Sequence, residues 1–127
     1  VWTKDTAATN WAYSGGTGTI TFNSRYVAYK IVGKTLTVNF SVNFDVVSNT
    51  VQFISYAFPA INRTGLQQIN KPMYRIQSST SSFASRLHVN TNNPFTIALA
   101  YTEDGGSTQW PVGTGYLVQG EFTVEIN

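Results

Sequence analysis

One stretch of the chain decides the fold, and it reads Leu36-Thr37-Val38-Asn39-Phe40-Ser41-Val42-Asn43-Phe44-Asp45-Val46. Apolar and polar residues alternate along it without a break. Successive side chains of a β-strand point to opposite faces, so this pattern predicts a strand with one buried face and one face in water. A helix, with its period of 3.6 residues, would scatter the same apolar residues around its whole surface.

The two-residue period recurs along the rest of the chain. We expect further strands within residues 19–22, 26–32, 51–57, 73–77, 83–89, 95–101 and 122–126. Turn-forming residues separate these segments, among them Asn23-Ser24, Gly33-Lys34 and Ser48-Asn49. The pattern predicts an all-β chain with no significant helix: an antiparallel, jelly-roll-like β-sandwich of about eight or nine strands. A barrel made from a single sheet is the alternative.

Length and composition predict a single domain. The chain has 127 residues, of which 42% are hydrophobic, and this apolar content excludes a disordered chain. No linker, repeat or charge block divides it, so we expect one β-sandwich domain spanning residues 1–127. The chain does not begin with Met, and we therefore expect it to be a piece of a longer polypeptide or a processed product.

Charge and cysteine content exclude several function classes. Only 11% of residues are charged, and the formal net charge of +2 comes with no basic stripe, so we expect no nucleic-acid partner. No apolar run approaches the roughly 18 residues of a membrane span, so we expect no membrane insertion. The absence of Cys excludes disulfides, a thiolate nucleophile and thiolate metal sites.

The residues that carry acid–base chemistry are few and scattered, so we expect no enzyme. The single histidine, His88, has no acidic residue near it in the sequence to orient it as a general base. Glu121 and Glu125 have the even spacing of one solvent-facing strand side, whereas a glycosidase needs two carboxyl groups that face each other across a cleft. We also expect no metal site and no cofactor.

Ligand binding through aromatic residues is the hypothesis that survives. Trp11, Tyr13 and Trp110 lie in turn-rich stretches, and Tyr101 lies at the end of an expected strand. Sugar rings stack on such aromatic faces while amide side chains, here Asn92 and Asn93, bind the hydroxyl groups. Arg86 and His88 are further candidates, for an anionic sugar. The alternative is that these aromatic residues close the ends of the sandwich.

The order of several motifs resembles a known family. Trp2-Thr3 opens the chain, a Tyr26-to-Lys34 segment leads into the long alternating strand, Phe58-Pro59 follows the next strand, and Gly115-Tyr116 precedes a closing Gly120-to-Val124 strand. This arrangement resembles the C-terminal β-sandwich domains of bacteriophage tail fibres and other receptor-binding virion proteins. It covers most of the chain but rests on strand and turn patterns, and residues 60–94 match nothing in it.

The resemblance implies that this chain is the C-terminal fragment of a longer virion protein, and it also implies a location and partners. Such modules sit on the outside of the virion, are usually homotrimers, and attach the particle to a glycan or protein of the bacterial host surface without catalysing a reaction. Two other functions remain open. The first alternative is a structural module for trimerisation or capsid decoration that binds no receptor. The second is a carbohydrate-binding module of a glycoside hydrolase.

Overall fold

The computed structural model describes residues 2–5, 8–59, 61–63, 65–67, 69–77, 81–89, 95–102 and 108–127. Within them the chain forms nine β-strands and one short 3₁₀-helix, η1 (Ala8–Asn10). The strands are β1 (Thr3–Asp5), β2 (Trp11–Gly16), β3 (Thr19–Val32), β4 (Thr35–Val47), β5 (Val51–Ala57), β6 (Ile69–Gln77), β7 (Ser81–Val89), β8 (Thr96–Ala100) and β9 (Gly113–Glu125). No described helix is long and apolar enough to cross a membrane. The all-β prediction is confirmed.

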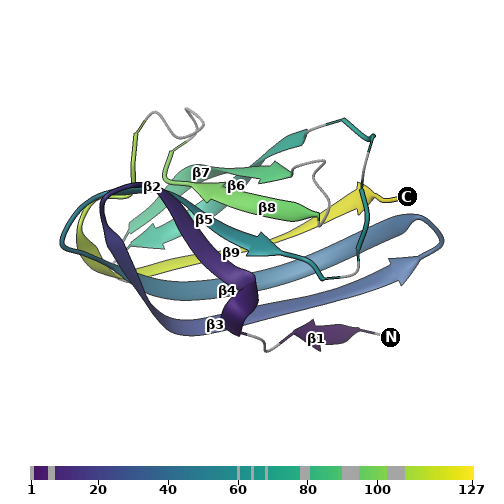
Figure 1. Cartoon of the computed structure of the whole chain (residues 1–127), viewed down its shortest axis with the longest axis horizontal. Coiled ribbons are helices and arrows are strands. Elements are labelled where there is room, and N and C mark those ends of the chain that lie inside the picture. The colour runs from purple at the N-terminus through teal and green to yellow at the C-terminus, as the bar shows by residue number, and fades with distance from the viewer. Residues whose placement is uncertain are drawn as a thin grey trace.

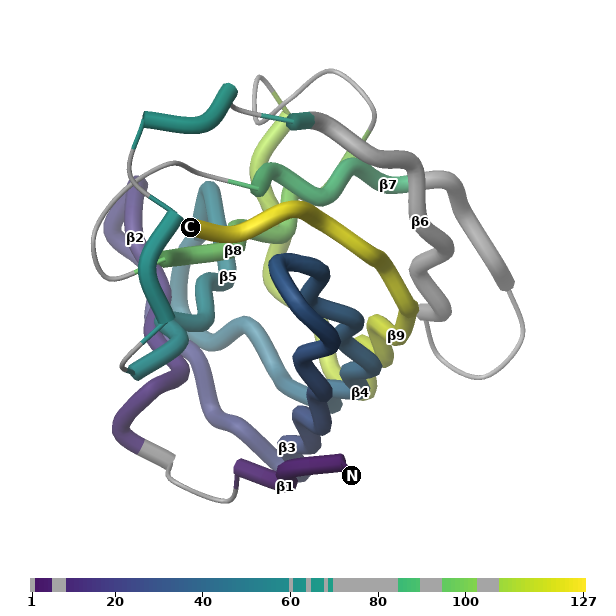
Figure 2. The backbone as a smooth tube through the Cα atoms, turned by 90° about the vertical axis from the view of Figure 1, so that its right-hand side faces the viewer, coloured from purple at the N-terminus to yellow at the C-terminus, as the bar shows by residue number. Residues whose placement is uncertain are grey.

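The strands are antiparallel and hydrogen-bonded in the order β1-β3-β4-β9-β6-β7-β8-β5-β2. The row curls over so that two four-stranded layers, β3-β4-β9-β6 and β7-β8-β5-β2, face each other, and short β1 extends the first layer beside β3 (Figure 1). The end view in Figure 2 shows the strands arranged around a common interior. The antiparallel sandwich is therefore present, with its layers continuous through the β6–β7 hairpin.

Strand β4 behaves as its alternating sequence predicts. Every even-numbered residue from Leu36 to Val46 is buried, while the odd-numbered residues are exposed or half-buried. The buried side chains pack with apolar residues of both layers into one core. Aromatic rings make up much of it, and Phe44 lies 5.1 Å from Trp110 and 5.5 Å from Tyr116, measured between ring centroids. Burial of this apolar stripe is the main force that holds the layers together.

One expected turn is instead a β-bulge. Asn23-Ser24 does not end a strand, because β3 runs unbroken from Thr19 to Val32 and its pairing register with β4 shifts between Phe22 and Ser24. The Asn23 amide nitrogen donates to Asn43 Oδ1 at 3.0 Å and to Asp45 Oδ1 at 3.1 Å. These bonds give the extra residue a polar partner on β4, so the strand continues past it. The turn expected at Gly33-Lys34 is confirmed as the β3–β4 hairpin.

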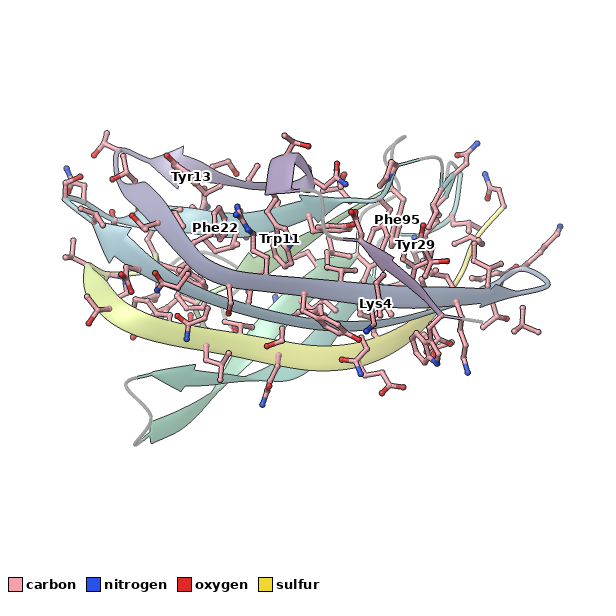
Figure 3. All side chains as sticks on the ribbon, turned by 90° about the horizontal axis from the view of Figure 1, so that it is seen from below. Lys4, Trp11, Tyr13, Phe22, Tyr29 and Phe95 are labelled. Atoms are coloured by element: carbon pink, nitrogen blue, oxygen red, sulfur yellow. The ribbon has the colours of Figure 1, made fainter. Side chains whose placement is uncertain are left out.

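Two N-terminal strands were not expected from the sequence. Strand β1 pairs with β3, with Thr3 opposite Tyr29 and Lys4 opposite Ala28. Strand β2 pairs with β5 and contains Trp11 and Tyr13, which the sequence places in a turn-rich stretch. At the seam between β2 and β3, Trp11 and Phe22 approach each other with ring centroids 6.2 Å apart, and both are labelled in Figure 3. The N-terminal segment thus completes both layers.

Candidate ligand-binding site

An open pocket of about 370 Å³ lies on the outer face of β1, β3 and β4. It is lined by Trp2, Lys4, Tyr26, Ala28 and Asn39. These residues come from three segments that the sheet brings together. Figure 3 looks at this side of the molecule and shows Lys4 apart from the core residue Trp11 and from Phe22, which packs against the core.

Strand register explains why these residues meet. Lys4 is paired with Ala28, and Ala28 is paired with Asn39, so the three form one row across β1, β3 and β4. Tyr26 lies two residues before Ala28 on the same face of β3. Val27 and Tyr29, the neighbours of Ala28, belong to the opposite, core-facing side, where Val27 is fully buried and Tyr29 packs against the core.

The floor and walls of the pocket differ in size and exposure. Ala28 is only 2% exposed although it lies on the outer face, whereas Trp2 is 44% and Tyr26 41% exposed. A methyl side chain flanked by large aromatic residues leaves a hollow, and a longer residue at position 28 would fill it. Exposed aromatic rings beside an amide and an amine are typical of a site that binds a ligand with both apolar and hydroxylated surfaces.

A second lysine joins this site through the tryptophan. Lys30 Nζ lies 5.0 Å from the centroid of the Trp2 ring, within the range of a cation–π contact. Lys30 is two residues beyond Ala28 and points to the same outer face of β3. The aromatic ring therefore has a positive charge at its face and another, on Lys4, within the same pocket.

Strand β1 is attached to the core beneath the pocket. The hydroxyl of Tyr56, a fully buried residue of β5, donates a hydrogen bond to Asp5 Oδ2. Asn10 Nδ2 donates to the same oxygen at 2.7 Å. Since Asp5 closes the three-residue strand that begins just after Trp2, these bonds fix the segment that carries Trp2 and Lys4.

Trp110 and Trp11, two of the residues expected to bind ligand, belong to the core. Trp110 is 0% exposed, its indole N–H donates to the Leu99 carbonyl at 3.2 Å, and its backbone pairs with Val51. Trp11 is 6% exposed and packs edge-on against Tyr56 with ring centroids 5.1 Å apart. Neither ring presents a face to solvent, so the structure favours the alternative that they close the sandwich.

Tyr101 and Tyr13 are placed differently. Tyr101 is half-buried, with its ring centroid 5.0 Å from that of Trp110, so it covers that end of the core. Tyr13 is 39% exposed on β2, but it does not line the pocket. Asn92 and Asn93 lie outside the described residues.

Arg86 and His88 lie on the other layer. Both belong to β7, where the buried residues Leu87 and Val89 flank His88, as the alternation predicts. The His88 ring stands edge-on to Phe53 of β5, with centroids 5.5 Å apart. Its Nε2 is buried and has no hydrogen-bond partner among the described residues. Burial, with a smaller contribution from the positive charge of Arg86, lowers the pKa of His88 below its ordinary value.

The acidic residues that the structure describes lie on strands β1, β4 and β9, and the aspartates among them are engaged in hydrogen bonds. Glu121 and Glu125 are exposed on β9 and alternate with the buried residues Phe122 and Val124, as predicted. Asp45 Oδ1 accepts hydrogen bonds from Asn23 and from the Gly115 backbone N–H. Within the described part of the chain, no three His, Asp or Glu side chains are grouped as metal ligands.

Comparison with known proteins gives no family. Neither protein-family models, nor curated proteins, nor solved structures match this chain. The site must therefore be interpreted from its own residues.

One feature of the sequence, the position of Tyr26, indicates this pocket. Tyr26 lies in the polar register of its strand, since Val27 and Tyr29 take the core-facing positions. A large aromatic residue at a solvent-facing strand position indicates a binding surface. Nothing local predicts that Trp2 joins it, because the pairing of β1 with β3 joins residues far apart in the chain.

Proposed function

We propose that this chain is a non-enzymatic module that binds a glycan on a bacterial surface through the pocket formed by Trp2, Lys4, Tyr26, Ala28 and Asn39. The observation that carries the proposal is the arrangement of exposed Trp2 and Tyr26 around the buried Ala28. A sugar ring stacks its C–H groups on an aromatic face, and Asn39 and Lys4 are suited to bind its hydroxyl groups.

We further propose that the module belongs to the outside of a bacteriophage particle, as the tip of a tail fibre or a similar appendage, and acts as a homotrimer. The motif resemblance supports this context. Three weak pockets on one rigid assembly would gain avidity through their high effective concentration. The same pocket on a monomeric chain would instead favour a carbohydrate-binding module of a glycoside hydrolase.

The strand pairing supports a jelly-roll type of sandwich. The pairs β6–β7, β5–β8 and β4–β9 are nested within one another. Nested antiparallel pairs are what a long hairpin produces when it rolls up into two layers, and we propose that the domain follows this plan.

Aromatic substitutions test the glycan-binding proposal. Trp2→Ala and Tyr26→Ala are to be measured against an array of bacterial surface polysaccharides, beside Tyr13→Ala as the matched control. Tyr13 is a comparably exposed aromatic residue outside the pocket. We expect at least a tenfold loss of affinity for the first two variants and no change for the third.

Two outcomes would contradict this assignment. Loss of binding in Tyr13→Ala with full binding in Trp2→Ala would move the site to β2. Failure of the folded wild-type protein to bind any polysaccharide, together with normal host adsorption by particles that lack the domain, would remove the function itself.

A structural role is the second candidate function, and one observation favours it. Ile31 and Val32, at the end of β3, are 47% and 71% exposed and lie just beyond Lys30. Val32 is on the same side of β3 as Lys30, so with Trp2 it places apolar surface on the outer face near the β3–β4 hairpin, while Ile31 exposes apolar surface on the other side of the strand. Sedimentation of Trp2→Ala and Val32→Ser separates the two functions. Dissociation of the oligomer indicates an interface, whereas an intact oligomer with lost glycan binding indicates a site.

A further inference from the structure

The positive charges around the pocket indicate which class of glycan it binds. This inference rests on the proposed function. We infer that the ligand is an acidic saccharide, a sugar that carries a carboxylate, sulfate or phosphate group, and that Lys4 and Lys30 bind this group beside the Trp2 ring. Lys4 lines the pocket and Lys30 Nζ lies 5.0 Å from the Trp2 ring centroid. A ring stacked on Trp2 would therefore have ammonium groups within reach of its substituents.

The two lysines keep their charge available. Among the residues that the structure describes, neither Lys4 nor Lys30 forms an ion pair with a carboxylate. The described aspartates are engaged elsewhere: Asp5 with Tyr56 and Asn10, and Asp45 with Asn23 and Gly115. An anionic ligand would thus meet positive charge without breaking an ion pair of either lysine with a described carboxylate.

A carboxylate lies one strand beyond the Asn39 side of the pocket. Asn39 is paired with Glu121 of β9, so the row from Lys4 through Ala28 and Asn39 ends at a carboxylate. Glu121 would repel the anionic group of a ligand and leave the Asn39 side for hydroxyl groups. This polarity gives the pocket a preferred direction for the sugar and discriminates against ligands with an acid at the wrong position.

A glycan array with matched members tests this inference. It contains neutral polysaccharides and carboxylated, sulfated and phosphorylated ones, and each acidic glycan that binds is measured again after removal of its charge. Carboxyl reduction, desulfation and dephosphorylation distinguish the three sources of negative charge. The protein variants are Lys4→Gln and Lys30→Gln, with Lys34→Gln as a control that removes the same charge at the β3–β4 turn, outside the pocket.

We expect acidic glycans to bind, and removal of their charge to weaken binding at least tenfold. Lys4→Gln and Lys30→Gln should each weaken binding of acidic glycans at least tenfold, whereas Lys34→Gln should have no effect. Equal binding of neutral glycans that still depends on Trp2 would overturn the acidic class and leave the proposed function intact. Equal losses of glycan affinity in all three lysine variants would also overturn the acidic class. Such losses would indicate general attraction of anionic glycans to the positively charged chain. If no glycan binds, the proposed function fails, and this inference fails with it.

Discussion

The hydroxyl of Tyr56 donates a hydrogen bond to the carboxylate of Asp5, and this contact joins the buried core to the strand that carries the candidate site. Tyr56 is fully buried, and Asp5 ends the edge strand that follows Trp2. A strand of three residues buries little surface of its own, so its position depends on such contacts. The shape of the pocket is therefore coupled to the integrity of one hydrogen bond inside the sandwich.

Removal of that hydroxyl is expected to weaken both stability and binding. Tyr56→Phe keeps the buried ring and deletes only the donor to a charged acceptor, which typically contributes about 1.5–3 kcal/mol. Loosening of β1 would also reduce glycan affinity. Tyr116→Phe is the matched control, because the Tyr116 hydroxyl donates to the Pro111 carbonyl at 2.9 Å, well away from the pocket residues.

Urea unfolding and glycan titration of both variants check this coupling. We expect both to lower the free energy of unfolding and only Tyr56→Phe to lower affinity. If Tyr56→Phe binds glycan as well as Tyr116→Phe does, β1 does not depend on this bond.

Trp110 is expected to act on stability alone. It is fully buried, contacts Phe44, Tyr101 and Tyr116, and donates its indole hydrogen bond to Leu99. Truncation of such a residue typically costs about 3–5 kcal/mol. Denaturant unfolding of Trp110→Ala should show a loss of this size, and Trp110→Phe a smaller one. Because Trp2 is exposed, the free energy of unfolding of Trp2→Ala should stay within about 0.5 kcal/mol of that of the wild type. Comparable stability of all three variants would show that Trp110 does not belong to the core.

His88 predicts a pH dependence of stability. Its pKa is lowered in the folded chain from the ordinary 6.5, so the unfolded chain takes up a proton first as the pH falls. The free energy of unfolding should therefore be highest above pH 6.5 and decrease below it until the folded state is protonated as well. As the chain has a single histidine, His88→Gln should remove this component. Parallel curves for wild type and variant between pH 7 and pH 5 would contradict the assignment.

Asp45 is expected to stabilise irregularities on both of its neighbouring strands. Its Oδ1 accepts from Asn23, at the β3 bulge, and from the N–H of Gly115 at 2.8 Å, near the register shift between β4 and β9. Asp45→Ala leaves both donors without this acceptor and should destabilise the domain by about 1–3 kcal/mol. Asp45→Asn keeps one acceptor oxygen and should lose less. Chemical denaturation measures both, and equal losses would mean that the charge matters more than the acceptor.

The strands of the fold could be predicted where the information is local. In β4 the alternation alone predicts which residues are buried, and Glu121 and Glu125 on β9 face solvent for the same reason. The β3 bulge could not be predicted in this way, because Asn23 resembles a turn residue until its partners Asn43 and Asp45 are known. Bulges depend on the neighbouring strand as much as on their own.

The candidate site was harder to predict for the same reason. Trp110 has loop-like neighbours in Gln109 and Pro111, yet a bridge to Val51 draws it into the core. Trp2 directly precedes β1, a short strand without alternation, and only the pairing of β1 with β3 brings Trp2 to Tyr26 and Ala28. Trp2, Tyr13 and Tyr26 are exposed, and which aromatic residues reach the surface depends on long-range strand pairing.

The indole N–H signals of the three tryptophans test the central claim most directly, because one lies in the pocket and two lie in the core. Nitrogen-15-labelled protein is titrated with the polysaccharide that binds best on the array, and the three signals are assigned by substitution to Phe. We predict that the Trp2 signal shifts with increasing ligand while the Trp11 and Trp110 signals stay in place. A shift of Trp11 or Trp110 with Trp2 unmoved would show that the glycan binds elsewhere and would contradict the account.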